Sequence, residues 1–155
     1  MLNFNSTLGE LELYQVYLEA SEPIEKISNI LRENPQLPGV ILFKNDLLIG
    51  SLSRNSFWEY LSRRYALELC SARNIEFLLN CLDIKTFILS ADNSILEATK
   101  KTLAREKNLI NEPIIVKTAP KEYKLLDVSQ LFVAQSKIYE LTRELLNQTN
   151  KKLEE

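Results

Sequence analysis

The chain has 155 residues, 45% of them hydrophobic, and a formal net charge of −2 from 19 basic and 21 acidic side chains, which suits one compact domain with its own core and gives no overall field that would attract nucleic acid. The sequence contains no histidine, so it cannot form a Ser/His/Asp triad, a Cys/His pair or a histidine metal site. Its three glycines are too few and too scattered for a P-loop or a GxGxxG turn, and we expect neither a catalytic site nor a metal site.

The first half of the chain predicts a strand, a helix, a two-stranded hairpin and a second helix. Pro23 suits the first turn of the first helix, and Pro35 prevents that helix from continuing. Ser53 is expected to cap the second helix by accepting a hydrogen bond from a free backbone N–H. The predicted elements are, in order, residues 15–18, 24 to before 34, 40–43, 47–52 and a helix from about 54.

An ordered connector over residues 63–80 leads to a second half with the same order of elements. In this half, Asp127 and Gln130 have the spacing of a helix cap and its partner three residues later, a close variant of the capping box. The predicted elements are a strand at 86–89, a helix from 95 to about 105, strands at 114–116 and 123–126, and a last helix that runs to the chain end.

Apolar residues on the last helix form a seam at Ile138, Leu141 and Leu145, with the 3-4 spacing of a short coiled coil. The helix is expected to extend beyond the domain, where it has little intramolecular surface to cover. The seam therefore favours self-association into a homodimer, although it could also pack back onto the domain.

The two halves are similar in sequence as well as in element order. Equivalent apolar positions lie 71 residues apart at the start of each half and 74 apart at its end. The pairs are Leu18 and Leu89, Ile24 and Ile95, Val40 and Ile114, and Leu52 and Leu126. The chain is therefore an internal duplication whose second copy has gained three residues. Because a duplicated unit packs against its twin, we expect a cleft between the copies and a functional site in it.

The two cysteines, Cys70 and Cys81, do not form a disulfide framework, and no signal pattern opens the sequence. The longest apolar runs, such as 40–43, are much shorter than the roughly 20 residues of a membrane helix. We therefore expect a cytoplasmic protein that does not span a membrane.

The unit that ends in GSLSRNSF resembles the CBS domain, named after cystathionine β-synthase, and its recurrence over residues 15–136 resembles a tandem CBS pair. This resemblance implies one module over residues 1–155 with an α+β fold of two strand–helix–strand–strand–helix repeats and a long C-terminal helix. The chain also resembles the N-terminal CBS pairs of bacterial signalling proteins, in which such a helix leads into a diguanylate cyclase or a histidine kinase. The implied parts are the first repeat (15–62), the connector (63–85), the second repeat (86–136) and the C-terminal helix (137–155).

The same resemblance implies a regulatory module rather than an enzyme, one that binds AMP, ATP or S-adenosylmethionine between its repeats and passes its state through the last helix to an effector domain. In the family, a Thr or Ser at the start of a helix contacts ribose or phosphate, and an Asp three residues later binds the ribose hydroxyls. The matching positions are Ser53 and Ser56 in the first copy and Asp127 and Gln130 in the second, so neither copy has the Asp. The further ligand-binding candidates are Arg54, Ala20, Val40, Ala91 and Ile114.

The candidate residues also have structural interpretations. Ser53 and Arg54 at a helix start could bind phosphate, or Ser53 could be a plain cap. Asp127 would repel a phosphate and suits capping. One working site is therefore expected near Ser53. The alternative function is a structural dimerisation module that has kept the fold and lost the ligand.

Overall fold

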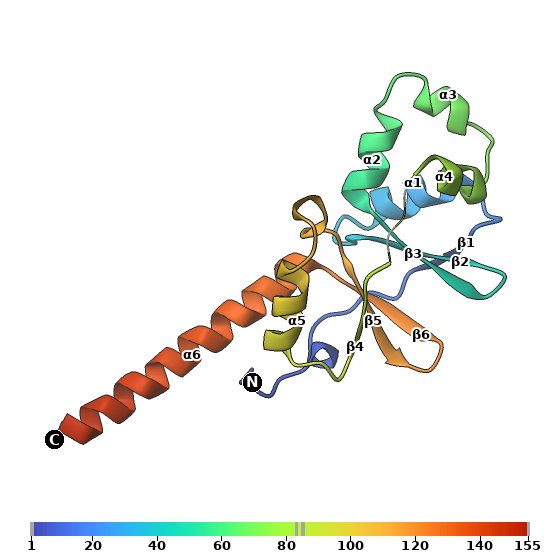
Figure 1. Ribbon diagram of the computed structural model, residues 1–155. Coiled ribbons are helices and arrows are strands. Elements are labelled where there is room, and N and C mark those ends of the chain that lie inside the picture. Colours follow the sequence, from blue (N-terminus) through green and yellow to red (C-terminus); the bar gives the residue numbers. More distant parts are fainter. Residues whose placement is uncertain (1, 83, 85, 155) are drawn as a thin grey trace.

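The structure, a computed structural model, describes residues 2–82, 84 and 86–154, and within them two three-stranded sheets carry helices on their flanks (Figure 1). The first half contains η1 (Leu8–Glu10), β1 (Tyr17–Glu19), α1 (Ile24–Glu33), β2 (Gly39–Lys44), β3 (Leu47–Ser53), α2 (Arg54–Leu61), α3 (Ala66–Cys70) and α4 (Ile75–Cys81). The second half contains β4 (Ile88–Ser90), α5 (Ile95–Leu103), η2 (Lys107–Leu109), β5 (Ile114–Ala119), β6 (Glu122–Leu126) and α6 (Val128–Glu154).

Both sheets have the same topology, and they share one register except near the turns of the two hairpins. In each, the first strand is parallel to the second, and the second is antiparallel to the third. The residues that pair across the strands are equivalent: Leu18 with Leu42 and Leu89 with Val116, then Val40 with Leu52 and Ile114 with Leu126. The structure thus confirms the predicted fold class, an α+β pair of strand–helix–strand–strand–helix repeats followed by a long helix.

The three residues gained by the second copy lie between α5 and β5. Residues 34–38 connect α1 to β2, whereas residues 104–113 connect α5 to β5 and include the turn η2. The longer loop is therefore the main break in the symmetry of the two repeats, apart from the extension of α6.

The segments that precede the two repeats are exchanged between them. Leu8 N donates to Asn93 O and Ile95 N donates to Ser6 O, both at 3.0 Å, so the segment around η1 pairs with the second repeat. The start of α4 makes the equivalent two bonds with the start of α1 in the first repeat. Leu8 and Ile75 are both fully buried. Each leading segment thus completes the core of the other repeat, and the duplicated unit begins earlier than its sequence similarity indicated.

A third group of apolar side chains lies between the sheets, where Ile41, Ile115 and Leu125 are fully buried. Tyr14 and Leu125 exchange two backbone hydrogen bonds of 2.8 Å, which join the residues before β1 to β6. Burial of a large aliphatic side chain contributes about 1.5–3 kcal/mol, so this contact holds the two repeats together as one unit.

Helix α6 leaves the domain and projects from it, as Figure 1 shows. Ile138 is only 1% exposed and packs in the core of the second repeat, while Leu145 is 64% exposed. Ile138 thus packs back onto the domain, one of the two alternatives for the seam of Ile138, Leu141 and Leu145, while Leu145 does not. In the described part of the chain, no helix is both long enough and apolar enough to cross a lipid bilayer.

Candidate functional site

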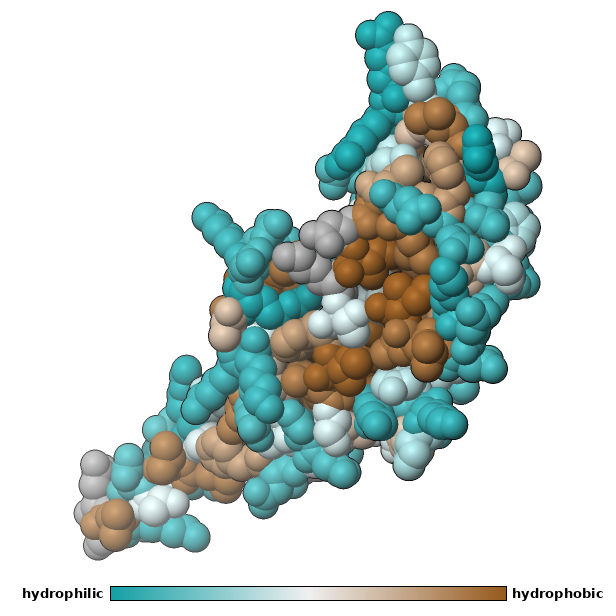
Figure 2. Space-filling view, turned by 45° about the vertical axis from the view of Figure 1, so that its right-hand side comes forward, coloured by the Kyte–Doolittle hydropathy of each residue, from teal (hydrophilic) through white to brown (hydrophobic). Residues whose placement is uncertain are grey.

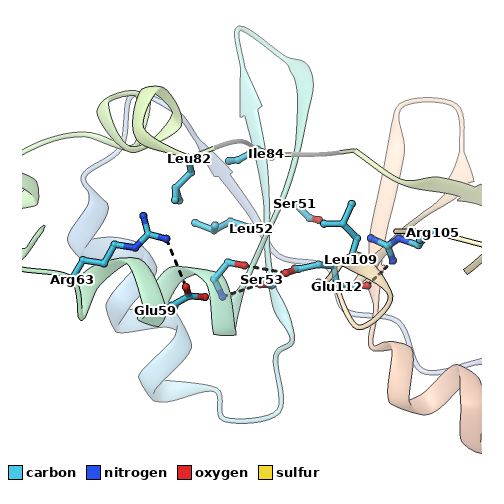
Figure 3. A pocket seen from close by; sticks show the side chains of 12 residues that line it. Ser51, Leu52, Ser53, Glu59, Arg63, Leu82, Ile84, Arg105, Leu109 and Glu112 are labelled. Atoms are coloured by element: carbon cyan, nitrogen blue, oxygen red, sulfur yellow. Dashed lines mark hydrogen bonds and ion pairs between the residues drawn. The ribbon is translucent and has the colours of Figure 1, made fainter. Parts of the chain in front are cut away.

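Two cavities lie where the start of α2 faces the loop before β5, so each has walls from both repeats. The first has a volume of about 160 Å³ and the second about 360 Å³. Ser53, Glu112 and Pro113 line both of them. Ligand pockets usually measure about 300–1,000 Å³. The first cavity, drawn in Figure 3, is therefore small for a ligand unless it opens toward the second.

Ser53 is buried at the corner between β3 and α2, and its position depends on a glycine. Its side chain accepts a hydrogen bond of 3.0 Å from Ser56 N, which confirms the predicted cap. Gly39 pairs with Ser53 across the strands, and a Cβ at Gly39 would lie 2.3 Å from Leu52 O. Only a residue without a side chain allows β2 to approach this corner so closely.

Arg54 borders the second cavity, but its guanidinium is bonded to the backbone of the loop between α1 and β2. Its Nε donates to Leu37 O at 2.9 Å and its Nη2 donates to Asn34 O at 2.6 Å. These bonds satisfy carbonyl groups at the end of α1 and in the following loop. They give Arg54 a structural role, and the phosphate contact that the sequence suggested stays a prediction.

Ser56 and Glu112 join the two repeats across the first cavity. Ser56 Oγ donates to Glu112 Oε1 at 3.0 Å. Arg105 Nη1 donates to Glu112 O at 2.9 Å, and the Arg105 guanidinium lies 4.4 Å from the centre of the Phe87 ring. Burial lowers the pKa of Arg105, an effect that the nearby Glu112 opposes, and the guanidinium stays charged. Glu112 is therefore held at its backbone by one repeat and at its carboxylate by the other.

The lining of the first cavity also includes an ion pair between Arg63 and Glu59. Arg63 lies 3.6 Å from Glu59, one turn back on α2, and 5.6 Å from the centre of the Tyr60 ring. A hydrogen bond to Cys81, together with burial, raises the pKa of Tyr60 to about 12, so this hydroxyl remains protonated. The lining thus combines two arginines with two glutamates, an arrangement that suits a polar ligand.

The two polar candidates of the second copy, Asp127 and Gln130, have partners in different parts of the structure. Asp127 Oδ1 accepts a hydrogen bond of 3.0 Å from Ser129 N, and Asp127 borders the second cavity together with Ser53 and Arg54. Gln130 points elsewhere, because its Nε2 donates to Tyr14 Oη at 3.3 Å and reaches Glu12 Oε2 at 3.5 Å. The predicted capping-box variant is therefore wrong in its second half, since Gln130 is bonded to the segment before β1.

Four apolar candidates line neither cavity. Val40, Ile114 and Ala20 are buried, and the first two belong to the cores of the first and second repeats. Ala91 accepts a hydrogen bond of 3.0 Å from Gly9 N through its carbonyl oxygen. These positions support the repeats rather than the cavities.

Several lining residues that were not predicted from the sequence come from the loop that holds the gained residues. Arg105, Leu109 and Glu112 line the first cavity, and Asn108 and Asn111 line the second. The change of offset from 71 to 74 occurs between Ile95 and Ile114 and so was a signal for this loop. The alignment could not show that the loop faces α2 of the other repeat.

Comparison with known proteins identifies solved structures that share this fold. No protein-family model and no curated protein matches the sequence. CBSX2, a CBS-pair protein from Arabidopsis thaliana, is 12% identical with a TM-score of 0.64, over 88% of this chain and 98% of that one. A CBS domain-containing protein from Bacillus anthracis is 11% identical with a TM-score of 0.64, over 86% of this chain and 96% of that one. The chain in the crystal structure of CBSX2 in complex with AMP is 13% identical in sequence, with a TM-score of 0.59, over 86% of this chain and 98% of that one. The chain therefore has the fold of a tandem CBS pair.

Proposed function

We propose that the protein is a regulatory module that binds an adenosine-type ligand at the two cavities between its repeats. The observation that carries this proposal is the bond between Ser56 and Glu112, because it places polar groups from both repeats at one site next to the capped start of α2. The AMP complex of CBSX2, which has the same fold, supports the choice of ligand class. A ligand that contacts both repeats stabilises one arrangement of them relative to others.

Helix α6 is the part through which such a change would reach an effector, because it begins at the second cavity and leaves the domain. Asp127, which lines that cavity, immediately precedes the first residue of the helix. The effector would be a domain of the kind that follows CBS pairs in bacterial signalling proteins, a diguanylate cyclase or a histidine kinase.

The test is isothermal titration calorimetry with AMP, ATP, S-adenosylmethionine and adenosine. Thermal denaturation of the protein in the presence of each compound follows. We expect saturable binding of at least one, with a gain of about 2.7 kcal/mol in the free energy of unfolding at a hundredfold excess over Kd. Ser56→Trp fills the first cavity and should abolish binding, whereas Ser136→Trp, at an exposed position of α6, should leave it intact. Absence of binding by all four compounds would contradict the proposal.

The second candidate function is a dimerisation module, and an exposed seam on α6 favours it. Tyr139, Leu146 and Leu153 are 54%, 59% and 79% exposed and follow each other at intervals of seven residues. Thr142 and Thr149 complete a 3-4-3-4 spacing between them, as in a coiled coil. In the projecting part of α6, at the lower left of Figure 2, apolar and polar side chains lie next to each other.

The threonines are compatible with an apolar seam because their hydroxyls are bonded within the helix. Thr142 Oγ1 donates to Ile138 O and Thr149 Oγ1 donates to Leu145 O, both at 2.9 Å. Their polar groups are therefore satisfied when the seam is covered. A second copy of the chain, with the same heptad spacing, is the partner that this seam fits.

Sedimentation velocity of two matched variants tests the seam. Leu146→Lys introduces a charge into it, and Asn147→Lys makes the same charge change on the neighbouring polar face. We expect the parent chain and Asn147→Lys to sediment as dimers and Leu146→Lys as a monomer. A monomeric parent chain, or a Leu146→Lys dimer, rules out this interface.

A further inference from the structure

Glu112 forms the boundary between the two cavities. It lines both of them, and its carboxylate accepts a hydrogen bond from Ser56 of the other repeat. With a volume of about 160 Å³, the first cavity is smaller than most ligand pockets. A ligand larger than this must extend along the shared wall, where it meets the carboxylate of Glu112.

The arginines around the cavities already have acceptors. Arg54 donates to two backbone carbonyls, Arg63 is paired with Glu59, and Arg105 donates to Glu112 O. Each guanidinium has five N–H donors, and these contacts engage only some of them. The arginines therefore do not exclude a phosphate by themselves, and selectivity against it has to come from the carboxylates.

The carboxylates around the second cavity add a repulsive effect. Glu112 and Asp127 both line this cavity, as Ser53 does. Two negative charges a few ångströms from a ligand phosphate disfavour it strongly in a partly buried site. A ligand hydroxyl, in contrast, can donate to Glu112, because an ionised carboxylate accepts about four hydrogen bonds, and the bond from Ser56 uses one of these.

We propose that Glu112 makes this site selective for a ligand that donates hydrogen bonds and is neutral or cationic, such as a ribonucleoside or a cationic adenosine derivative, and that it excludes multiply charged nucleotides. This inference rests on the proposed function and specifies its ligand class. Its basis is the carboxylate that the lengthened loop before β5 places against the start of α2, where it spans the two repeats.

The test compares adenosine with ATP in calorimetric titrations of the parent chain, Glu112→Gln and the control Glu106→Gln. The Glu112→Gln substitution keeps the shape of the side chain and an acceptor for Ser56 but removes the charge, and Glu106 is an exposed residue of the same loop. We expect the parent chain to bind adenosine more tightly than ATP. In Glu112→Gln, adenosine should bind about tenfold more weakly and ATP about tenfold more tightly, while Glu106→Gln changes neither Kd more than about twofold.

Opposite shifts for the two ligands separate selectivity from general damage to the site. Glu112→Asp provides a second measurement, because it keeps the charge and shortens the side chain. Adenosine should bind this variant more weakly, while ATP stays excluded. Added salt should also reduce the difference between the Kd values of adenosine and ATP in the parent chain. In Glu112→Gln it should have little effect on that difference. Tighter binding of ATP than adenosine by the parent chain, or an unchanged ratio in Glu112→Gln, overturns this inference alone. No binding of either ligand by the parent chain overturns this inference, and absence of binding by AMP and S-adenosylmethionine as well overturns the proposed function.

Discussion

At the scale of single residues, Gly39 sets the geometry of the site through close packing. The Cβ of an alanine at this position would lie 2.3 Å from Leu52 O and 2.9 Å from Ser53 Cα, and both of these are backbone atoms of the neighbouring strand. Backbone atoms cannot turn away as a flexible side chain can. Gly39→Ala should therefore lower the free energy of unfolding by about 1–3 kcal/mol, as measured by urea denaturation.

Gly9 provides a matched control for this substitution. A Cβ there would have its nearest neighbours at 3.5 Å, an ordinary contact distance, and the residue is exposed. Gly9→Ala should change the free energy of unfolding by less than about 0.5 kcal/mol. Equal effects of the two substitutions would show that the approach of β2 to Ser53 is not tight.

Glu22 is the residue that should make stability depend on pH. Hydrogen bonds from Lys26 and from Glu19 N hold the pKa of its carboxyl below the usual value of 4.5. Because the folded state lowers this pKa, the stabilisation is present above about pH 4.5 and is lost as the pH falls through the lowered value. Glu22→Gln should lower the free energy of unfolding by about 0.5–1 kcal/mol at pH 7.

The difference between Glu22→Gln and the parent chain should decrease toward zero on acidification to about pH 2–3. Glu140→Gln, at an exposed position of α6, serves as a control and should show no such convergence. Urea denaturation at several pH values measures both. A difference that stays constant over this range would exclude Glu22 as the source.

At the scale of elements, α6 has an inner part that belongs to the core and an outer part that does not. Ile138→Ala should lower the free energy of unfolding by about 2–5 kcal/mol, because it leaves a cavity among buried side chains of the second repeat. Leu145→Ala, on the same helix, removes an exposed side chain and should cost less than about 0.5 kcal/mol. Chemical denaturation of the two variants at low concentration, where self-association does not contribute, makes the comparison. Similar losses would show that Leu145 is packed within the folded chain as Ile138 is.

The elements themselves were largely predictable, because each depends on a local pattern. The strands around Val40 and Ile114 and the helix stripe after Pro23 follow from spacing and from residues that begin or end helices. Pro23 proved to be the N-cap of α1 rather than its first helical residue. The pairing of η1 with the second repeat was not predictable, because its backbone bonds join Leu8 to a residue far along the chain and leave no local pattern.

The site was predictable only in part, for a similar reason. Ser53 was recognised as a cap from its position before a helix, and the structure agrees. The acceptors of Arg54 and the donor to Glu112 could not be read from the sequence, because they depend on which loops meet α2 in space. The partners of Gln130 were missed for the same reason, since they belong to the segment before β1.

At the scale of the whole molecule, the exchanged segments turn two repeats into one structural unit. The segment around η1 completes the core of the second repeat, and α4 completes that of the first, so neither repeat has its full core without a piece from outside it. The buried contact of Ile41 with Ile115 and Leu125 adds a direct link between the sheets. Such connections favour unfolding in a single transition.

Leu8 offers a test of this cooperativity, because it lies in the core of the second repeat while the single tryptophan, Trp58, lies on α2 of the first. Leu8→Ala should lower the free energy of unfolding by about 2–5 kcal/mol. If the repeats unfold together, the urea midpoint seen by Trp58 fluorescence should fall as far as the midpoint seen by far-ultraviolet circular dichroism, which reports on all helices. Ile75→Ala, in the core of the first repeat, should shift both midpoints in the same way. A Leu8→Ala variant whose Trp58 midpoint stays at the parent value would show that the first repeat is stable without the second.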